Sequence, residues 1–502
     1  RIELTGANLT LDAPIDVTNV GNLHVAFTRA LFTAQPITGT GSLSMTSSGA
    51  GAVGVLVLLN ENTYAGATSV DTGTLRIGNR TATGSINTLP VTLSNNANLQ
   101  ISRSDNTMVF PNEIGGTGNV IIGVTAAVTA PEYDSLVTLT GNNTFTGGLT
   151  VSSGGVKIQN PAALGTGAKT VNLTNGTAGR SQFYLDGSSA NITVPDTVSF
   201  FTSSTNLSHP AIGNLAGDNV ISGSITLAAG GGSTAVSVLG GSLALNGGIS
   251  SNSSGRSLIL GGATGAPGTI NGVVSDGTNP VGIQVSGENV WKLTSANTYT
   301  GATTVNSGTL LVNGAQNIAT GAVNVVGGTL GGIGTLGGNV TVQAAGTIAP
   351  GEGIGILTTS NATTIDGTLR VDIDGTSADK LVVGSTLDIG GATLTVNATG
   401  AGPTQPVYII AQASAPIVGT FATTNIPAGY NVVVNYDGLN QIALVSGTPY
   451  SNWETANGIT AAGAAADSDN DGVSNGIEFV IGGDPSGPGS DSSSLLPTVA
   501  TT

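Results

Sequence analysis

The fold of the chain is decided by a unit that reads Asn143-Thr144-Phe145-Thr146-Gly147-Gly148-Leu149-Thr150-Val151, then Gly154-Gly155-Val156-Lys157-Ile158. Apolar residues alternate with polar ones on both sides of the intervening Ser-Gly pair. This is the pattern of two strands that share one buried face and are joined by a tight turn. Gapless copies start at Asn62 and Asn297, and a degenerate copy starts at Asn219. The anchoring asparagines recur every 78 residues or so, at roughly constant spacing, which indicates a repeat protein.

Composition decides between the two all-β architectures that such a repeat allows, a β-solenoid and a string of small sandwiches. Aromatic side chains make up 4% of the 502 residues, too few for a series of sandwich cores, whereas 78 glycines suit tightly wound coils. We therefore predict an all-β, elongated, single-stranded β-solenoid (a parallel β-helix) over residues 1–448. Residues 401–448 are expected to form terminal coils, closed by larger side chains: Tyr408, Phe421, Tyr430 and Tyr436.

The charge balance excludes several classes of partner. The chain has 12 basic and 28 acidic side chains and a formal net charge of −16, so it lacks the clustered lysine and arginine of a nucleic-acid-binding surface. Its longest apolar run, residues 51–59, is half as long as a membrane-spanning helix, so we expect no membrane insertion. Without cysteine there is no disulfide or thiolate metal site. The start at Arg1 and the strand-like end from Leu495 to Thr502 indicate a fragment or processed form of a longer protein.

The repeat unit resembles the autotransporter-associated β-strand repeat of bacterial passenger domains. The shared pattern is Asn-Thr-Tyr/Phe-x-Gly-x-Thr-x-Val followed by Gly-Thr-Leu, and the resemblance extends over residues 50–445. Members of that family are secreted or surface-displayed β-helices, many of them adhesins or structural stalks. The resemblance therefore implies an extracellular or cell-surface bacterial protein with a structural or adhesive role and no enzymatic activity.

The composition changes at Pro449, and residues 449–502 read as an acidic linker and calcium-loop module. This segment holds 7 acidic residues and no lysine or arginine. Between Asp467 and Glu478, acids or amides stand at loop positions 1, 3, 5 and 9, Gly472 at position 6 and Glu478 at position 12, which is the spacing of an EF-hand loop. The predicted structural Ca²⁺ ligands are Asp467, Asp469, Asp471, the Val473 carbonyl, Asn475 and Glu478.

The same segment also allows a second interpretation, an acidic turn that binds no metal. Ser474 stands at a loop position that is usually aliphatic, and the alanine-rich stretch before the loop is a weak entering helix. Dockerin-type and thrombospondin-like calcium loops tolerate such changes, and the module resembles those. A short helix is expected over residues 477–481, ended by Gly482 and Gly483.

Other groups of chemically capable residues are weaker candidates. Asp372 and Asp374 share one strand face at about 6.6 Å, within the range of a glycosidase pair, and Asp379 and Lys380 would complete a lyase-like site. A solvated strand face that happens to be acidic is the favoured explanation of these residues, because only fold analogy supports the lyase-like site. Neither His24 nor His209 has metal-ligand spacing to another histidine. The lysine of residues 165–170 is misplaced for a phosphate loop.

Three functions remain open. The first is a structural subunit that self-associates head to tail into filaments, because residues 1–20 contain no amphipathic helix to cover the end of the stack, and because Leu495, Leu496 and Val499 are able to add a strand to a neighbour. The second is a monomeric adhesin that binds surface glycans through threonine and asparagine ladders. The third is a polysaccharide lyase or glycosidase that uses Asp372 and Asp374.

Overall fold

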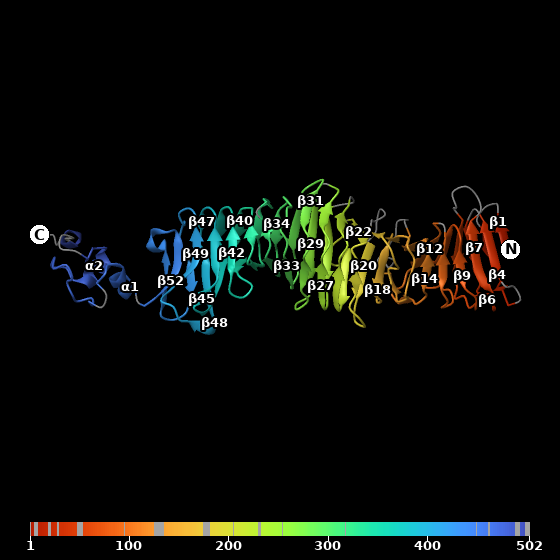
Figure 1. Cartoon of the computed structure of the whole chain (residues 1–502), viewed down its shortest axis with the longest axis horizontal. Coiled ribbons are helices and arrows are strands. Elements are labelled where there is room, and N and C mark those ends of the chain that lie inside the picture. The colour runs from red at the N-terminus through yellow and green to blue at the C-terminus, as the bar shows by residue number, and fades with distance from the viewer. Residues whose placement is uncertain are drawn as a thin grey trace, which may run out of the picture. The chain divides into compact units, whose positions relative to one another are not determined.

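The computed structural model describes most of the chain (Figure 1). The described residues are 2–4, 9–18, 22–27, 30–47, 54–94, 96–124, 135–173, 181–203, 205–228, 232–253, 255–316, 318–447, 449–459, 462–486 and 492–496. Contacts divide the chain into two units, residues 1–329 with 335–338, and residues 330–334 with 339–502. The expected module boundary at residues 448 and 449 falls inside the second unit.

Parallel pairing between successive coils builds the predicted β-solenoid. Strand β10 (Thr74–Thr81) pairs with β8 (Val55–Leu58) on one side and with β12 (Asn98–Arg103) on the other, and all three run in the same direction. Parallel pairing of the same kind runs along the sheets of 6, 12, 13 and 12 strands and through most of the 7-stranded sheet. Figure 1 shows strands of successive coils lying side by side. The β-solenoid prediction is therefore confirmed.

The core is a stack of aliphatic ladders, in which each residue lies over its register partner in the next coil. One ladder runs through four strands of the first unit and consists of Leu56, Leu75, Leu99 and Val120, none more than 1% exposed. Burial of successive aliphatic side chains supplies about 25 cal/mol for each Å² removed from water. A core this thin needs few aromatic rings, which accounts for the 4% aromatic content.

The asparagine that opens each repeat joins two coils. The Oδ1 atoms of Asn62, Asn143, Asn219 and Asn297 accept backbone N–H groups of the preceding coil at 2.8, 2.8, 2.6 and 2.7 Å. Those donors lie 23 to 29 residues earlier in the chain: Ile37, Ile114, Ile192 and Val274. All four asparagines are at least 97% buried. The degenerate copy at Asn219 makes the same bond as the other three, so all four copies join neighbouring coils in the same way.

The aromatic residue of each of the three clear copies is buried in its own local core: Tyr64, Phe145 and Tyr299. Tyr64 and Tyr299 share hydrogen bonds with the threonine hydroxyls four residues later, at 2.6 and 2.7 Å. The middle copy replaces this pair with Phe145 and Leu149, which have no hydroxyl groups. In that copy the ammonium of Lys169 lies over the Phe145 ring, 3.9 Å from its centre, as a cation–π contact.

The parallel pattern ends in the second unit. There β52 (Gln441–Ser446) pairs antiparallel with both β49 (Val407–Ala413) and β51 (Tyr430–Val434). The hydroxyl of Tyr408, a predicted closing residue, accepts the backbone N–H groups of Thr404 and Gln405 at 2.6 and 2.8 Å. The rings of Tyr408 and Tyr430 lie 6.0 Å apart, while Phe421 and Tyr436 remain partly exposed.

Three short helical elements follow the last strand. They are α1 (Pro449–Ala456), α2 (Asn475–Ile481) and the 3-10 helix η3 (Ser492–Leu495). Helix α2 ends at Gly482, whose left-handed backbone with φ +77° turns the chain, so the predicted stop is in place. Leu495 lies in η3 and not in a strand, and Val499 is outside the described residues. None of the helices in the described part of the chain is long and apolar enough to cross a membrane.

Candidate metal site in the acidic loop

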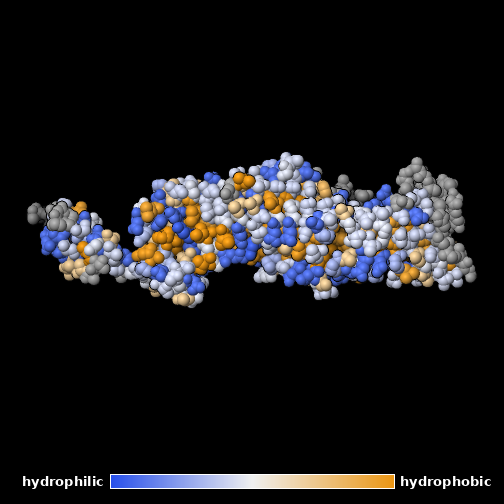
Figure 2. Space-filling model, viewed as in Figure 1, coloured by the Kyte–Doolittle hydropathy of each residue, from blue (hydrophilic) through white to orange (hydrophobic). Residues whose placement is uncertain are grey.

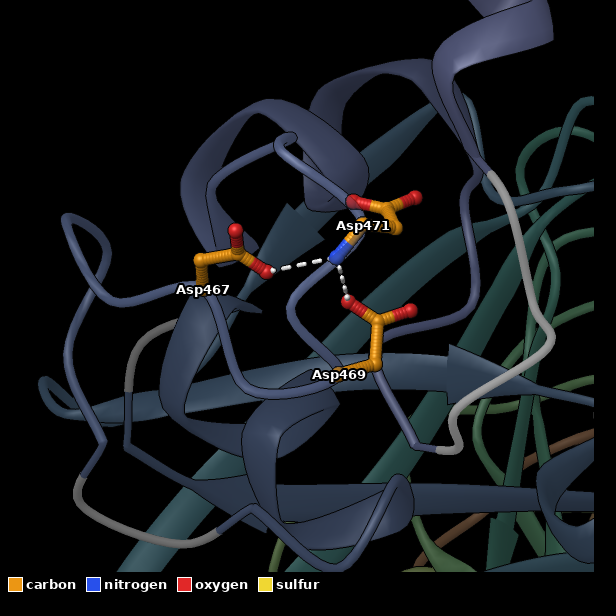
Figure 3. Close-up of side chains that lie close together, drawn as sticks. All are labelled: Asp467, Asp469 and Asp471. Carbon is orange, nitrogen blue, oxygen red and sulfur yellow. Dashed lines mark hydrogen bonds between the residues drawn. The ribbon is translucent and has the colours of Figure 1, made fainter.

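Three of the six predicted cation ligands lie together in the loop before α2. Carboxylate oxygens of Asp467, Asp469 and Asp471 come within 4.8 Å of one another (Figure 3). The backbone N–H of Asp471 donates to both other aspartates, at 3.2 Å to Asp467 Oδ1 and 3.3 Å to Asp469 Oδ1. Oxygen atoms converging at this spacing suit a hard divalent cation such as Ca²⁺.

The loop backbone turns where the spacing predicts. Gly472, at loop position 6, has φ +91°, a left-handed conformation that favours glycine. Its N–H donates to Asp467 Oδ2 at 3.0 Å, and the N–H of Val473 donates to Asp471 Oδ1 at 2.7 Å. These bonds hold the carboxylates in one turn without neutralising them. The role of the Val473 carbonyl as a ligand stays a prediction.

Glu478, at loop position 12, is fully buried, and it lies outside the group of three aspartates whose oxygens come within 4.8 Å of one another. Its Oε1 atom accepts the hydroxyl of Ser492 at 2.7 Å, and its Oε2 atom has no hydrogen-bond partner. Burial raises the pKa of Glu478, and repulsion from Asp469, Asp471 and Asp467 adds to the rise, whereas the Ser492 bond opposes it. A buried, unpartnered carboxylate oxygen near three acids is the position where a cation would be most stabilising.

Asn475, at loop position 9, is fully buried, and its side-chain amide bonds to other groups of the protein. Its Oδ1 atom accepts the N–H of Ser468 at 3.0 Å, and its Nδ2 atom donates to the Ser468 hydroxyl at 2.9 Å. In this arrangement Asn475 shapes the loop. The residue that sequence reasoning missed is Ser492, because it lies 14 residues after Glu478 and outside any loop pattern.

An aromatic cluster anchors the two helices around the loop. Tyr450 and Trp453 of α1 and Phe479 of α2 have ring centres 5.6 to 5.7 Å apart in all three pairs. Glu454 Oε1 also accepts the N–H of Gly463 at 2.7 Å. Because Phe479 follows Glu478 directly, the packing of the cluster fixes the helix that carries the last predicted ligand.

Asp372 and Asp374, the acidic pair on strand β44 (Thr368–Gly375), accept hydrogen bonds from the next coil. Asp372 Oδ1 accepts the side-chain amide of Asn397 at 2.9 Å, and Asp374 Oδ1 accepts the N–H of Ala401 at 3.0 Å. Asp379 is 1% exposed, and its two oxygens accept backbone N–H groups of Gly355 and Asp372. Burial raises the pKa of Asp379 to about 6. These contacts give the three carboxylates structural roles.

The remaining candidates have local explanations as well. His209 lies in a short exposed turn with Asn206, and the backbone of His24 lies in β4 (Asn22–Phe27) opposite Ser44.

In the segment 165–170, Lys169 Nζ donates to the carbonyls of Phe145 and Leu164, both at 2.6 Å. Burial lowers the pKa of Lys169 to about 8. The ammonium group of this lysine therefore stabilises a turn of the protein, which is a structural role and not that of a phosphate-binding lysine.

Comparison with known proteins agrees with the repeat. The family model described as Passenger-associated-transport-repeat matches residues 50–77, 137–158 and 285–312, and the ends of these matches coincide with the ends of the three clear copies. No curated protein sequence matches the chain. The repeats of autotransporter passenger domains are thus present at three places in a β-solenoid, and in both respects the chain is similar to the extracellular passenger domains of autotransporters.

Proposed function

We propose that the chain is a non-enzymatic, extracellular structural protein of a bacterial surface, in which the solenoid is a spacer and a building block of filaments. The observation that carries this proposal is the coil-to-coil bond made by the asparagine of every repeat copy. In each copy the buried asparagine of the repeat binds the backbone of the preceding coil and so holds two coils together. Because these polar side chains are bonded within the solenoid, they suit a mechanical role.

Edge strands support self-association into filaments. Strands β1 (Ile2–Leu4), β2 (Leu9–Leu11) and β3 (Ile15–Asp16) each stand first in their sheets, and β2 is paired in the described residues with β5 (Ala30–Thr33). Among the described strands none pairs with the outer edge of β1, β2 or β3, and an edge of this kind can pair its N–H and C=O groups with another chain. A contact between unlike ends repeats without closing, and it therefore builds filaments.

Sedimentation velocity with Ca²⁺ present tests this proposal. We expect concentration-dependent polymers of the wild-type chain and their loss in Thr10→Lys, because a charge on the edge strand β2 opposes strand addition. Thr92→Lys is the matched control, because Thr92 is equally exposed but lies in β11 (Val91–Leu93) between two paired strands. Monomers of the wild type at all concentrations, or equal polymerisation of both variants, would contradict the filament proposal.

An exposed apolar area favours adhesion as a second function. Ile333 and Ile356 of the second unit are 54% and 50% exposed, and Ile354 is 38% exposed. In Figure 2, apolar residues gather over the part of the second unit that includes β42 (Ile356–Thr359) and β49. Exposed apolar areas commonly mark interaction sites. Binding of monomeric protein to glycans or a surface, lost in Ile356→Lys, would identify an adhesin in place of a filament subunit.

The acidic loop is proposed to bind a structural Ca²⁺ ion. Asp467, Asp469, Asp471 and Glu478 would hold it, and the ion would supply the positive charge that this part of the described chain lacks. The fit rests on Glu478 Oε2, a buried oxygen without a partner. Calorimetric titration of the full chain with Ca²⁺ tests the proposal, and the same titration of Asp467→Asn is expected to show weaker binding or none.

A further inference from the structure

Ser492 connects two of the predicted ligands from outside the loop. Its backbone N–H donates to Asp471 Oδ2 at 2.5 Å, and its hydroxyl donates to Glu478 Oε1 at 2.7 Å. These carboxylates stand at loop positions 5 and 12. A single residue of η3 therefore contacts both the middle and the end of the loop.

The Ser492 hydroxyl has a fixed direction because a second bond orients it. The N–H of Asp484 donates to Ser492 Oγ at 3.2 Å, so the hydroxyl proton is left for Glu478. The serine is 3% exposed, which keeps water from competing for these bonds. The hydroxyl therefore accepts from Asp484 and donates to Glu478 at the same time.

Gly483 provides the space in which Ser492 sits. A Cβ atom at this glycine would come within 2.5 Å of Ser492 Oγ and 2.9 Å of Ser492 Cβ. The backbone of Gly483 is not in the left-handed region, so the close approach of Ser492 explains the need for glycine there. The chain after α2 is therefore shaped to bring Ser492 against the loop.

The two bonds decide which oxygen atoms are available to a cation. With Oε1 of Glu478 occupied by the hydroxyl, Oε2 is the atom without a partner. Groups that hydrogen-bond to metal ligands fix the orientation of those ligands and tune affinity, and their loss costs about 10–100-fold in metal affinity. Ser492 has the contacts of such a group for two ligands at once.

We propose that Ser492 is a positioning residue of the cation site, and that cation binding is coupled to docking of the segment Ser492–Leu495 against the loop. This inference rests on the proposed Ca²⁺ site and adds to it a residue outside the loop pattern. Because coupling between two equilibria is reciprocal, a docked serine raises cation affinity and a bound cation stabilises the docked segment by the same factor.

Two substitutions in the full chain test the inference. Ser492→Ala removes the hydroxyl and keeps the backbone bond, so it carries the test. Gly483→Ala crowds Ser492 without removing a polar group, but its Cβ would also come within 3.0 Å of Glu478 Cβ, so it serves as supporting evidence. We expect each to weaken Ca²⁺ binding by about 10–100-fold in calorimetric titration. Ser493→Ala, an exposed neighbour in η3, is the matched control and is expected to bind as the wild type does.

Two readouts separate positioning from a general structural role. Near-ultraviolet circular dichroism in chelator is expected to be unchanged in Ser492→Ala, and hydrogen exchange of the Ser492 amide is expected to slow on addition of Ca²⁺ in the wild type. Luminescence lifetimes of bound Tb³⁺ should reveal additional coordinated water in Ser492→Ala. If the wild type binds Ca²⁺ and both variants bind it with the same affinity, the inference about Ser492 is wrong, whereas the calcium proposal stands. No binding of Ca²⁺ by the wild type would overturn the calcium proposal and this inference with it.

Discussion

The solenoid repeat and the acidic loop treat buried polar groups in opposite ways. In the repeat, Asn143 is 2% exposed, and its amide bonds to Ile114 in the preceding coil and to Ala163 in the following one. In the loop, Glu478 is fully buried with one oxygen unpartnered and three aspartates nearby. The repeat finds its partners within the chain, whereas in the loop the proposed Ca²⁺ ion would supply the missing partner. If that proposal is correct, we expect the repeat to fold independently of ions and the loop to depend on one.

Removal of Ca²⁺ is expected to have the largest effect, and to affect the loop region alone. At a free Ca²⁺ concentration of about 1,000 times Kd, binding stabilises the folded loop by about 4 kcal/mol, and a chelator removes this contribution. The two tryptophans report the two regions separately. Trp291 is fully buried in the solenoid, and Trp453 packs on Phe479 next to Glu478. We expect chelation to lower the melting temperature of the transition seen by Trp453 and leave that of Trp291 in place.

Each tryptophan serves as the control for the other. In Trp453→Phe the chelator-sensitive fluorescence change should disappear, and in Trp291→Phe it should persist. A chelator that shifts both transitions equally would show that the solenoid also depends on ions, and the contrast between the regions would then be wrong. An unchanged Trp453 transition would count against a bound cation.

The loss of one repeat asparagine is expected to have the next largest effect. Asn143→Ala leaves the N–H of Ile114 and the carbonyl of Ala163 without their side-chain partner in a buried place, at a cost of about 1–3 kcal/mol for each unsatisfied group. Denaturant unfolding followed by Trp291 fluorescence measures the cost.

Asn142→Ala is the matched control. Asn142 is the exposed neighbour of Asn143, and its Oδ1 atom accepts the side-chain amide of Asn160 at 2.8 Å on the surface. Its replacement is expected to change the free energy of unfolding by less than about 0.5 kcal/mol. Equal effects of the two substitutions would mean that the coil-to-coil bond contributes nothing specific.

The sequence was sufficient to predict the solenoid and the place of the acidic loop, because both depend on local periodicity. Alternating residues such as Leu149 and Val151 indicate strands, and the glycine at 472 marks the turn between spaced acids. What the asparagines bind was not predictable, because their partners lie 23 to 29 residues away and depend on the number of residues in each coil. The same holds for Ser492, whose contact with Glu478 requires the path of the chain after α2.

Local pattern also leaves side-chain contacts open. Asn475 has the spacing of a ligand, and its amide bonds to Ser468; its role as a ligand stays a prediction. Of the residues 495–502 predicted to resemble a strand, Leu495 lies at the end of the 3-10 helix Ser492–Leu495, and residues 497–502 are outside the described part of the chain. Ser492 at the start of that helix bonds to Asp471 and Glu478, which are contacts that no local pattern indicates.

The smallest predicted effect concerns the hydroxyl pair of the first repeat copy. Tyr64 and Thr68 are buried and share a hydrogen bond of 2.6 Å, whereas the middle copy has Phe145 and Leu149 at the same positions. Tyr64→Phe alone leaves Thr68 Oγ1 without its partner and is expected to cost about 1 kcal/mol. The double variant Tyr64→Phe, Thr68→Val removes both polar groups and should recover most of that loss, as the middle copy implies. A double-mutant cycle by denaturant unfolding measures the coupling, and strictly additive losses would show that the two hydroxyls do not stabilise each other.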